Sequence, residues 1–154
     1  MKETERIVKL FADMYNGSPW IDSTIMGALE NISAEQAVAR VIEGRNSIWE
    51  LTNHMISWRQ NVLQRVQGKL MVSPDNNYIE PITDTSEAAW QNTLKEMENS
   101  QQEWILFLKT FNEDAFETMY PRNGMTYYEH IHGIIQHDAY HLGQIVMLAK
   151  SYRK

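Results

Sequence analysis

The sequence predicts an all-α protein. Apolar side chains recur at three- and four-residue spacing in four long segments, and three of these segments open on a capping signal, with Ser, Thr or Asp three positions before Glu. No segment shows the convincing alternation of a β-strand. Four substantial helices without strands are typical of a helical bundle. The length of 154 residues is close to that of one domain, so we expect a single helical bundle domain over residues 1–154.

The first long helix is expected over residues 3–16. Ile7, Phe11 and Met14 lie at helical spacing there, and Gly17-Ser-Pro ends the segment. Between this helix and the next long one, two short helical pieces are expected, one around residues 20–30 and one opening at the capping box Ser33-Ala-Glu-Gln36.

The three remaining long helices open at Ser47, Asp84 and Thr126. They are expected over residues 47–67, 84–111 and 126–151. Gly68 stands where a C-terminal cap of the second long helix would lie. The connection over residues 69–83 is longer than a tight turn between antiparallel helices needs, so it could run the length of the bundle. Another loop is expected over residues 112–125.

Composition and charge exclude several classes of partner and site. The net charge of −6 repels a phosphate backbone, so we expect no nucleic-acid partner. The absence of cysteine excludes disulfides, iron–sulfur ligation and a cysteine nucleophile, and leaves His, Asp and Glu as metal ligands. No apolar run approaches the roughly 18–20 residues that span a bilayer, and the first residues do not resemble a signal peptide. We therefore expect a soluble, cytoplasmic protein without a membrane partner.

Two of the five histidines, His137 and His141, are spaced to bind one metal ion. On a helix they project from successive turns on the same side, where both imidazoles can reach one divalent ion. That side also carries Ile134, Ile145 and Leu148, and it therefore faces the core. Imidazoles on a core-facing stripe need hydrogen-bond partners or a shared ion, because burying them unpaired costs roughly a few kcal/mol.

His54 is the third candidate ligand. It lies on the second long helix, at the edge of an apolar stripe that includes Leu51 and Val62, with Trp58 one turn later. Three neutral imidazoles from two helices leave coordination positions open, which is the layout of a catalytic zinc site. Glu50, one turn before His54, is a candidate base or a partner that orients a ligand histidine.

Simpler interpretations stand beside this one. An i,i+4 histidine pair taken alone is more often incidental than a metal site, and the histidines could be ordinary core residues. His130 shares the face of His137, but its place in the first turn of the last helix favours contact with core or solvent. His132 projects elsewhere and receives no role. A di-iron site is disfavoured, because Glu129–His132 is the single Glu-x-x-His pair.

Two segments resemble a known family. Residues 131–145, IHGIIQHDAYHLGQI, are similar to the last-helix signature of the DinB-like (YfiT-like) metalloenzyme superfamily. Residues 46–59, NSIWELTNHMISWR, resemble its second-helix signature, in which a lone histidine supplies the first ligand. The early Gly-Ser-Pro-Trp at 17–20 also fits, so the resemblance covers essentially the whole chain. Some relatives carry histidine where this chain has Asn46, and the role of Asn46 stays open.

The resemblance implies a fold, a site and a class of reaction. The fold is an up-down-down-up four-helix bundle, often a homodimer. The site is formed by His54, His137 and His141, which would hold a divalent metal, zinc or nickel. Characterised relatives include S-transferases and isomerases that use small thiols such as bacillithiol, mycothiol or glutathione. The function expected is therefore metal-dependent transfer of a low-molecular-weight thiol to a small electrophile. The alternatives are a metal-dependent hydrolase and a non-catalytic dimer that binds a metal or a small molecule.

Overall fold

Helices account for all the regular structure of the described chain. A computed structural model describes residues 1–152, and within them the only β-type pairing is an isolated bridge between Met119 and Thr126. The all-α prediction is confirmed for these residues. The long helices are α1 (Glu3–Asn16), α4 (Ile48–Val66), α5 (Glu87–Thr110) and α6 (Tyr127–Lys150). The short pieces are α2 (Ile25–Leu29), α3 (Ala34–Val38) and the 3-10 turn η1 (Glu113–Ala115).

Reciprocal side-chain caps begin α4 and α6 at the predicted positions. Ser47 accepts a hydrogen bond from the backbone N–H of Glu50, and the Glu50 carboxylate accepts one from the N–H of Ser47. Thr126 and Glu129 form the same pair at the start of α6. Each pair satisfies two backbone donors that the helix itself leaves free, so the sequence signal translates directly into a helix start.

Two other helix ends refine the sequence prediction. α5 begins at Glu87, because Ser86 rather than Asp84 caps it, and Asp84 instead accepts the N–H of Ser86. α4 ends at Val66, and Gly68 follows with a φ of +89°. Glycine adopts that left-handed conformation without steric cost. The C-terminal cap predicted at Gly68 is therefore confirmed.

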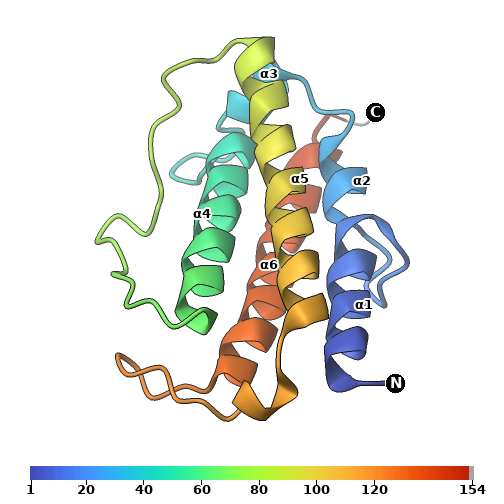
Figure 1. Cartoon of the computed structure of the whole chain (residues 1–154). Coiled ribbons are helices and arrows are strands. Elements are labelled where there is room, and N and C mark those ends of the chain that lie inside the picture. Colours follow the sequence, from blue (N-terminus) through green and yellow to red (C-terminus); the bar gives the residue numbers. More distant parts are fainter. Residues whose placement is uncertain (153–154) are drawn as a thin grey trace.

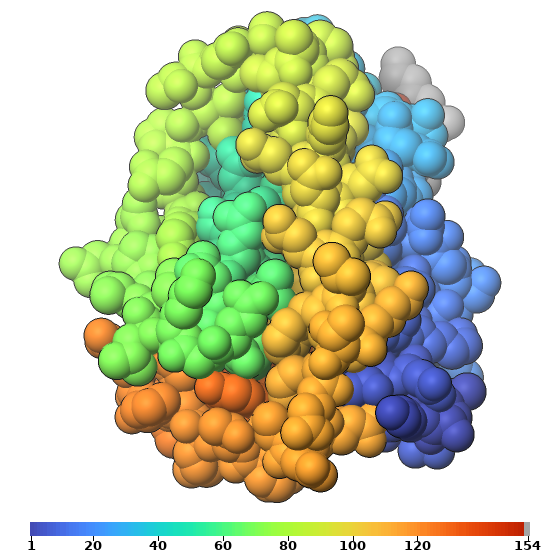
Figure 2. All heavy atoms as spheres, viewed as in Figure 1, coloured from blue at the N-terminus to red at the C-terminus, as the bar shows by residue number. Residues whose placement is uncertain are grey.

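The four long helices lie side by side with similar axis directions (Figure 1). α4 packs against α5 and α6, and α1 packs against the same two helices. Side chains of α4 and α5 fill the space between the two ribbons (Figure 2). The short α3 packs on α4 and α5, and α2 on α1 and α6. In this part of the chain we find no helix with the length and apolar character needed to cross a membrane.

The connection between α4 and α5, residues 67–86, runs along the outside of α4 from one end of the molecule to the other (Figure 1). The Asn61 side chain on α4 holds it by donating to the carbonyl of Val72 and to the hydroxyl of Tyr78. Asn77 and Tyr78 adopt left-handed backbone angles, with φ of 55° and 58°. Asparagine tolerates this conformation better than most residues. The turn brings the backbone of the connection back toward α4.

The core contains two apolar clusters with a buried polar layer between them. The polar layer consists of Arg59 on α4, Gln101 on α5 and Asp138 on α6, each at most 3% exposed. Arg59 donates through Nε to Asp138 at 3.0 Å and through Nη2 to Gln101 at 2.7 Å. The clusters on either side include Trp90, Met97 and Leu142 in one and Phe11, Trp104 and Ile134 in the other.

The polar layer fixes α6 against α4, and the sequence-based prediction did not include it. Arg59 and Asp138 are enclosed, so neither charge is solvated by water, and each depends on the other. Asp138 directly follows His137, so the ion pair sets the height of α6 relative to α4 at the level where the predicted ligands lie.

Removing one member of the pair should destabilise the fold strongly. We expect Asp138→Ala to lower the free energy of unfolding by about 3–5 kcal/mol, because it leaves the Arg59 guanidinium buried without a counter-charge. Urea denaturation followed by circular dichroism measures this. Arg6→Ala, which removes the exposed Arg6–Glu3 pair, serves as the control and should cost less than about 1 kcal/mol. Equal losses in the two variants would show that the buried pair does not hold the helices together.

Candidate metal centre

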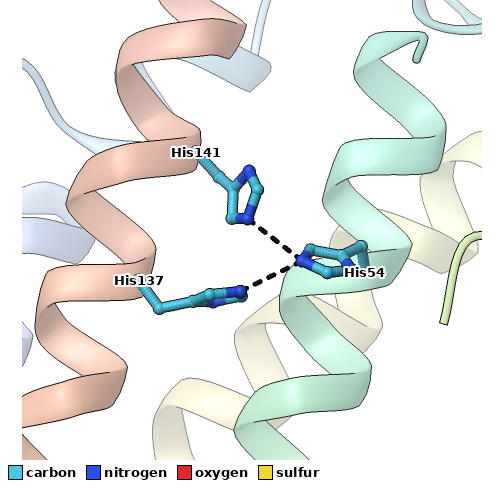
Figure 3. A group of neighbouring side chains, drawn as sticks. All are labelled: His54, His137 and His141. Carbon is cyan, nitrogen blue, oxygen red and sulfur yellow. Dashed lines mark hydrogen bonds between the residues drawn. The ribbon is translucent and has the colours of Figure 1, made fainter. Parts of the chain in front are cut away.

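The structure brings the three predicted histidines together. His54 projects from α4, and His137 and His141 project toward it from successive turns of α6 (Figure 3). The Nε2 atom of His54 lies 3.0 Å from Nε2 of His137 and 3.0 Å from Nε2 of His141. All three ligand atoms lie within 4.8 Å of one another, and the group could hold a metal ion. We call these residues the histidine cluster.

Hydrogen bonds on the far side of two rings fix where their protons lie. Nδ1 of His54 lies 2.6 Å from the backbone carbonyl of Asn77, and Nδ1 of His141 lies 2.6 Å from Oε1 of Gln144. The carbonyl oxygen of Asn77 only accepts, as does Oε1 of Gln144, so with the Gln144 amide in this orientation both Nδ1 atoms carry a proton and, in the neutral rings, both Nε2 atoms carry a lone pair. Two lone pairs therefore face each other across 3.0 Å. That arrangement is repulsive unless a cation lies between them.

A proton is a poor candidate for that cation at neutral pH. Burial lowers the pKa of His54 and of His141 below the ordinary histidine value. Burial, with the neighbouring His141 and His54, lowers the pKa of His137 to about 3. All three rings are therefore neutral near pH 7, which is the form that binds a metal.

The donor set fits a divalent metal ion. Two imidazole nitrogens at about 2.1 Å from one ion are about 3.0–3.4 Å apart for bond angles between about 90° and 110°. The separations of 3.0 Å between His54 and its two partners agree with this. Hydrogen bonds from Nδ1 to a carbonyl oxygen are the usual way in which proteins orient a ligand histidine. Three protein donors of this kind leave coordination positions for another molecule.

Asn77 and Gln144 contact two members of the histidine cluster, and the sequence-based prediction gave them no role. Asn77 orients His54 with its backbone and accepts a hydrogen bond from the indole N–H of Trp58 with its side chain, at 2.9 Å. Gln144 lies three positions after His141 on the same helix, and this spacing could have indicated the contact. No comparable signal links Asn77 to His54, because the left-handed turn of the connection between α4 and α5 brings them together.

Glu50 lies apart from the histidine cluster. Its carboxylate binds the Arg40 guanidinium and the backbone N–H of Ser47, and both oxygens are used. Burial alone would raise the pKa of Glu50, but the bonds from Arg40 and Ser47 outweigh burial and hold this pKa below its ordinary value. Both ring nitrogens of His54 have other partners. The predicted role of Glu50 as a base or a histidine partner therefore has no contact that supports it.

The remaining histidines also lie outside the cluster. His130 is buried in the first turn of α6, with its two nitrogens against the carbonyl of Thr126 and the amide of Asn123. The His132 ring packs on Tyr128, with ring centroids 4.3 Å apart. The structure thus brings together the three histidines selected from the sequence and leaves these two in other surroundings.

Two cavities lie near the cluster, one beside Gln144, the partner of His141, and one bordering His137. One, of about 340 Å³, is lined by Asn46, Leu51 and Gln144. The other, of about 170 Å³, is lined by residues that include Trp58 and His137 itself. The cluster therefore borders a space that a small molecule could enter, which a purely structural metal site does not require.

The fold and the cluster together define a class, namely an all-helical protein with three converging imidazoles suited to one metal ion. Comparison with known families gives the particular family. The sequence profile of the DinB superfamily matches residues 23–145, which include all three histidines. The chain belongs to the DinB superfamily, and the resemblance seen in the two helical segments is confirmed. Searches of curated proteins and of solved structures gave no match.

The lowered histidine pKa values predict how the metal-free fold responds to pH. The unfolded chain binds protons at these histidines more readily than the folded chain, so the stability they contribute is complete above about pH 6.5. It is lost as the pH falls toward the folded-state values, about 3 for His137. We expect the free energy of unfolding, measured by urea denaturation with a chelator present, to fall as the pH is lowered from about 6.5 to about 5.

His137→Gln should flatten this decline, because glutamine does not titrate. Most carboxylates are already ionised over that interval and contribute little to the slope. A decline that is unchanged in His137→Gln would contradict the assignment of a buried, neutral His137.

Proposed function

We propose that this chain is a metal-dependent enzyme in which His54, His137 and His141 hold one divalent ion, zinc or nickel. The observation that carries the proposal is the convergence of three imidazoles, with Nε2 of His54 3.0 Å from Nε2 of both His137 and His141, while Asn77 and Gln144 hold the Nδ1 atoms of His54 and His141. The cavity that borders His137 supports a catalytic rather than a structural use of the ion.

The reaction proposed is transfer of a low-molecular-weight thiol to a small electrophile, as in a bacillithiol-type S-transferase. A divalent ion lowers the pKa of a thiol or a water molecule that binds it, and so supplies a nucleophile near neutral pH. The chain itself has no cysteine, so any sulfur nucleophile has to come from a small molecule. Membership of the DinB superfamily is compatible with this chemistry.

The protein's own residues would position and shield the reacting groups. Asn77 and Gln144 keep the Nδ1 protons on the far side of their rings, so the Nε2 lone pairs stay directed at the ion. Trp58 packs at 6.5 Å from the His137 ring and is fixed by its bond to Asn77, so it forms an apolar wall beside the cluster. Apolar walls limit access of water and strengthen the electrostatic effect of the ion.

The proposal extends to fold and assembly. The lengthwise course of residues 67–86 (Figure 1) supports an up-down-down-up four-helix bundle. We also propose that the protein is a homodimer, because of the family resemblance, and that it is cytoplasmic, because of its composition. A hydrolase, with water in place of the thiol, and a non-catalytic binding dimer are the alternatives that remain if thiol transfer is not found.

Metal content tests the ligand set. Elemental analysis of protein purified without a histidine tag should find about one zinc or nickel per wild-type chain, and less than about a tenth of that in His54→Ala and His137→Ala. His132→Ala, which removes a histidine outside the cluster, is the matched control and should retain the metal. No stoichiometric metal in the wild type, or unchanged content in His137→Ala, would exclude the proposed site.

The metal-loaded wild type should then transfer small thiols to general electrophiles, and His54→Ala should not. Absence of transfer by a fully loaded protein, across several thiols and electrophiles, would reject the transferase and leave hydrolysis or simple binding.

A further inference from the structure

The smaller of the two cavities leads from His137 toward a buried arginine. We call it the Arg65 groove. Its volume is about 170 Å³, and its walls include Trp58 and Arg65 from α4 and Gly133 and His137 from α6. Gly133 lies one helical turn before His137, and a Cβ atom added there would meet no atom within 4 Å. The absence of a side chain at this position keeps the groove open beside the cluster.

The Arg65 side chain is held rigidly in the wall of this groove. It is 8% exposed, and its guanidinium carbon lies 5.4 Å from the Trp58 ring and 5.2 Å from the Tyr120 ring. Nε donates to Asn61 at 2.7 Å, and Nη2 donates to Ser73 at 3.0 Å. The guanidinium is thus positioned between two aromatic rings by contacts that are all uncharged.

The positive charge of Arg65 has no negative partner among residues 1–152. The ion pairs found there use other cations, and the other deeply buried arginine, Arg59, is paired with Asp138. Glu129 also borders the groove, but its Oε2 accepts the N–H and the hydroxyl of Thr126, and it is beyond ion-pair distance from Arg65. A buried charge without a counter-charge is costly, and here it borders a space next to the cluster.

The donors that remain free on Arg65 have a specific geometry. Nε and one N–H of Nη2 are used on one edge of the guanidinium, so Nη1 and the second N–H of Nη2 remain at its end. Nη1 has no partner in the described chain and is not among its enclosed, unpartnered atoms. Two parallel N–H groups match the two oxygens of a carboxylate.

We propose that Arg65 anchors the carboxylate of a small-molecule ligand that lies in the Arg65 groove and extends toward the histidine cluster. The seven positions from Trp58 to Arg65 cover about 10 Å, which sets the scale of such a ligand. The groove is smaller than the roughly 300–1,000 Å³ of drug-sized sites, so the ligand class is a short carboxylic acid. The idea that the other end of this ligand reacts at the metal rests on the function proposed above. The carboxylate contact with Arg65 does not depend on that function.

Binding of hexanoate and hexanamide to metal-free protein tests the carboxylate contact without any reaction. The probe is the amide chemical shift of Gly133, followed by NMR titration. Hexanoate should bind about ten- to a hundredfold more tightly than hexanamide, as expected for a charge-assisted pair of hydrogen bonds. Arg65→Gln should abolish this preference. Arg6→Gln, which changes an exposed arginine outside both cavities, is the matched control and should keep it.

Two further variants test the groove independently of Arg65. Gly133→Leu should block both ligands by filling the groove, whereas Gly143→Leu, at an exposed glycine of the same helix with equally free space, should not. Hexanoate and hexanamide binding equally, a preference that survives in Arg65→Gln, or inorganic phosphate binding more tightly than hexanoate would each overturn the carboxylate assignment.

A second titration separates this proposal from the proposed function. In cobalt-loaded protein, mercaptohexanoate should produce a sulfur-to-metal absorption band at about a tenfold lower concentration than mercaptohexanol. A hexanoate preference in the metal-free protein with no such band would retain the Arg65 contact and reject thiol binding. If the band appears at the same concentration of both thiols, thiol binding to the metal is retained and the Arg65 contact is rejected.

Discussion

The mutual approach of the His54 and His141 lone pairs is the constraint on which the site depends. Each Nδ1 is committed to a carbonyl oxygen, so each Nε2 is left without a proton, and the two atoms are 3.0 Å apart. Burial lowers the pKa of both rings and so removes the proton as a bridging charge near neutral pH. A metal ion would convert this repulsion into two bonds, with His137 as the third donor. The arrangement of α4, α6 and the connection holds these atoms in place.

The Arg59–Asp138 ion pair and the histidine cluster both join α6 to α4, through consecutive residues of α6. His137 and Asp138 are consecutive, and their side chains contact different parts of α4, His54 in one case and Arg59 in the other. The Arg59–Asp138 pair is enclosed and cannot shift without losing its partner, so it limits how far α6 can slide along α4. Preorganisation of this kind keeps ligand atoms near their bonding positions before the metal arrives.

Much of this arrangement could be predicted from local sequence signals. The starts of α4 and α6 follow from reciprocal caps at Ser47 and Thr126, and the end of α4 follows from Gly68. The i,i+4 spacing of His137 and His141 selected two members of the cluster, because helix geometry places such residues on one face. The start of α5 was displaced because Asp84 and Ser86 are both capping residues, and the sequence does not rank them.

The contacts that were not predicted join parts of the chain that are distant in sequence. In the sequence, Arg59 and Asp138 look like ordinary polar residues of two separate helices. They become buried partners only when α4 and α6 pack against each other. Asn77 reaches His54 because a left-handed turn returns the connection to α4. Glu50 lies one turn from His54, but the Arg40 guanidinium, ten positions earlier in the chain, takes its carboxylate.

X-ray absorption spectroscopy of the zinc- or nickel-loaded protein tests the central claim most directly. The outer-shell scattering of imidazole rings counts the histidine ligands of the ion. We predict three imidazoles, with any remaining ligands supplied by water or a small molecule, and a fall to two in His54→Ala if metal is forced in at high concentration. A spectrum with one imidazole or none would contradict the account, as would four protein ligands that leave no place for a substrate.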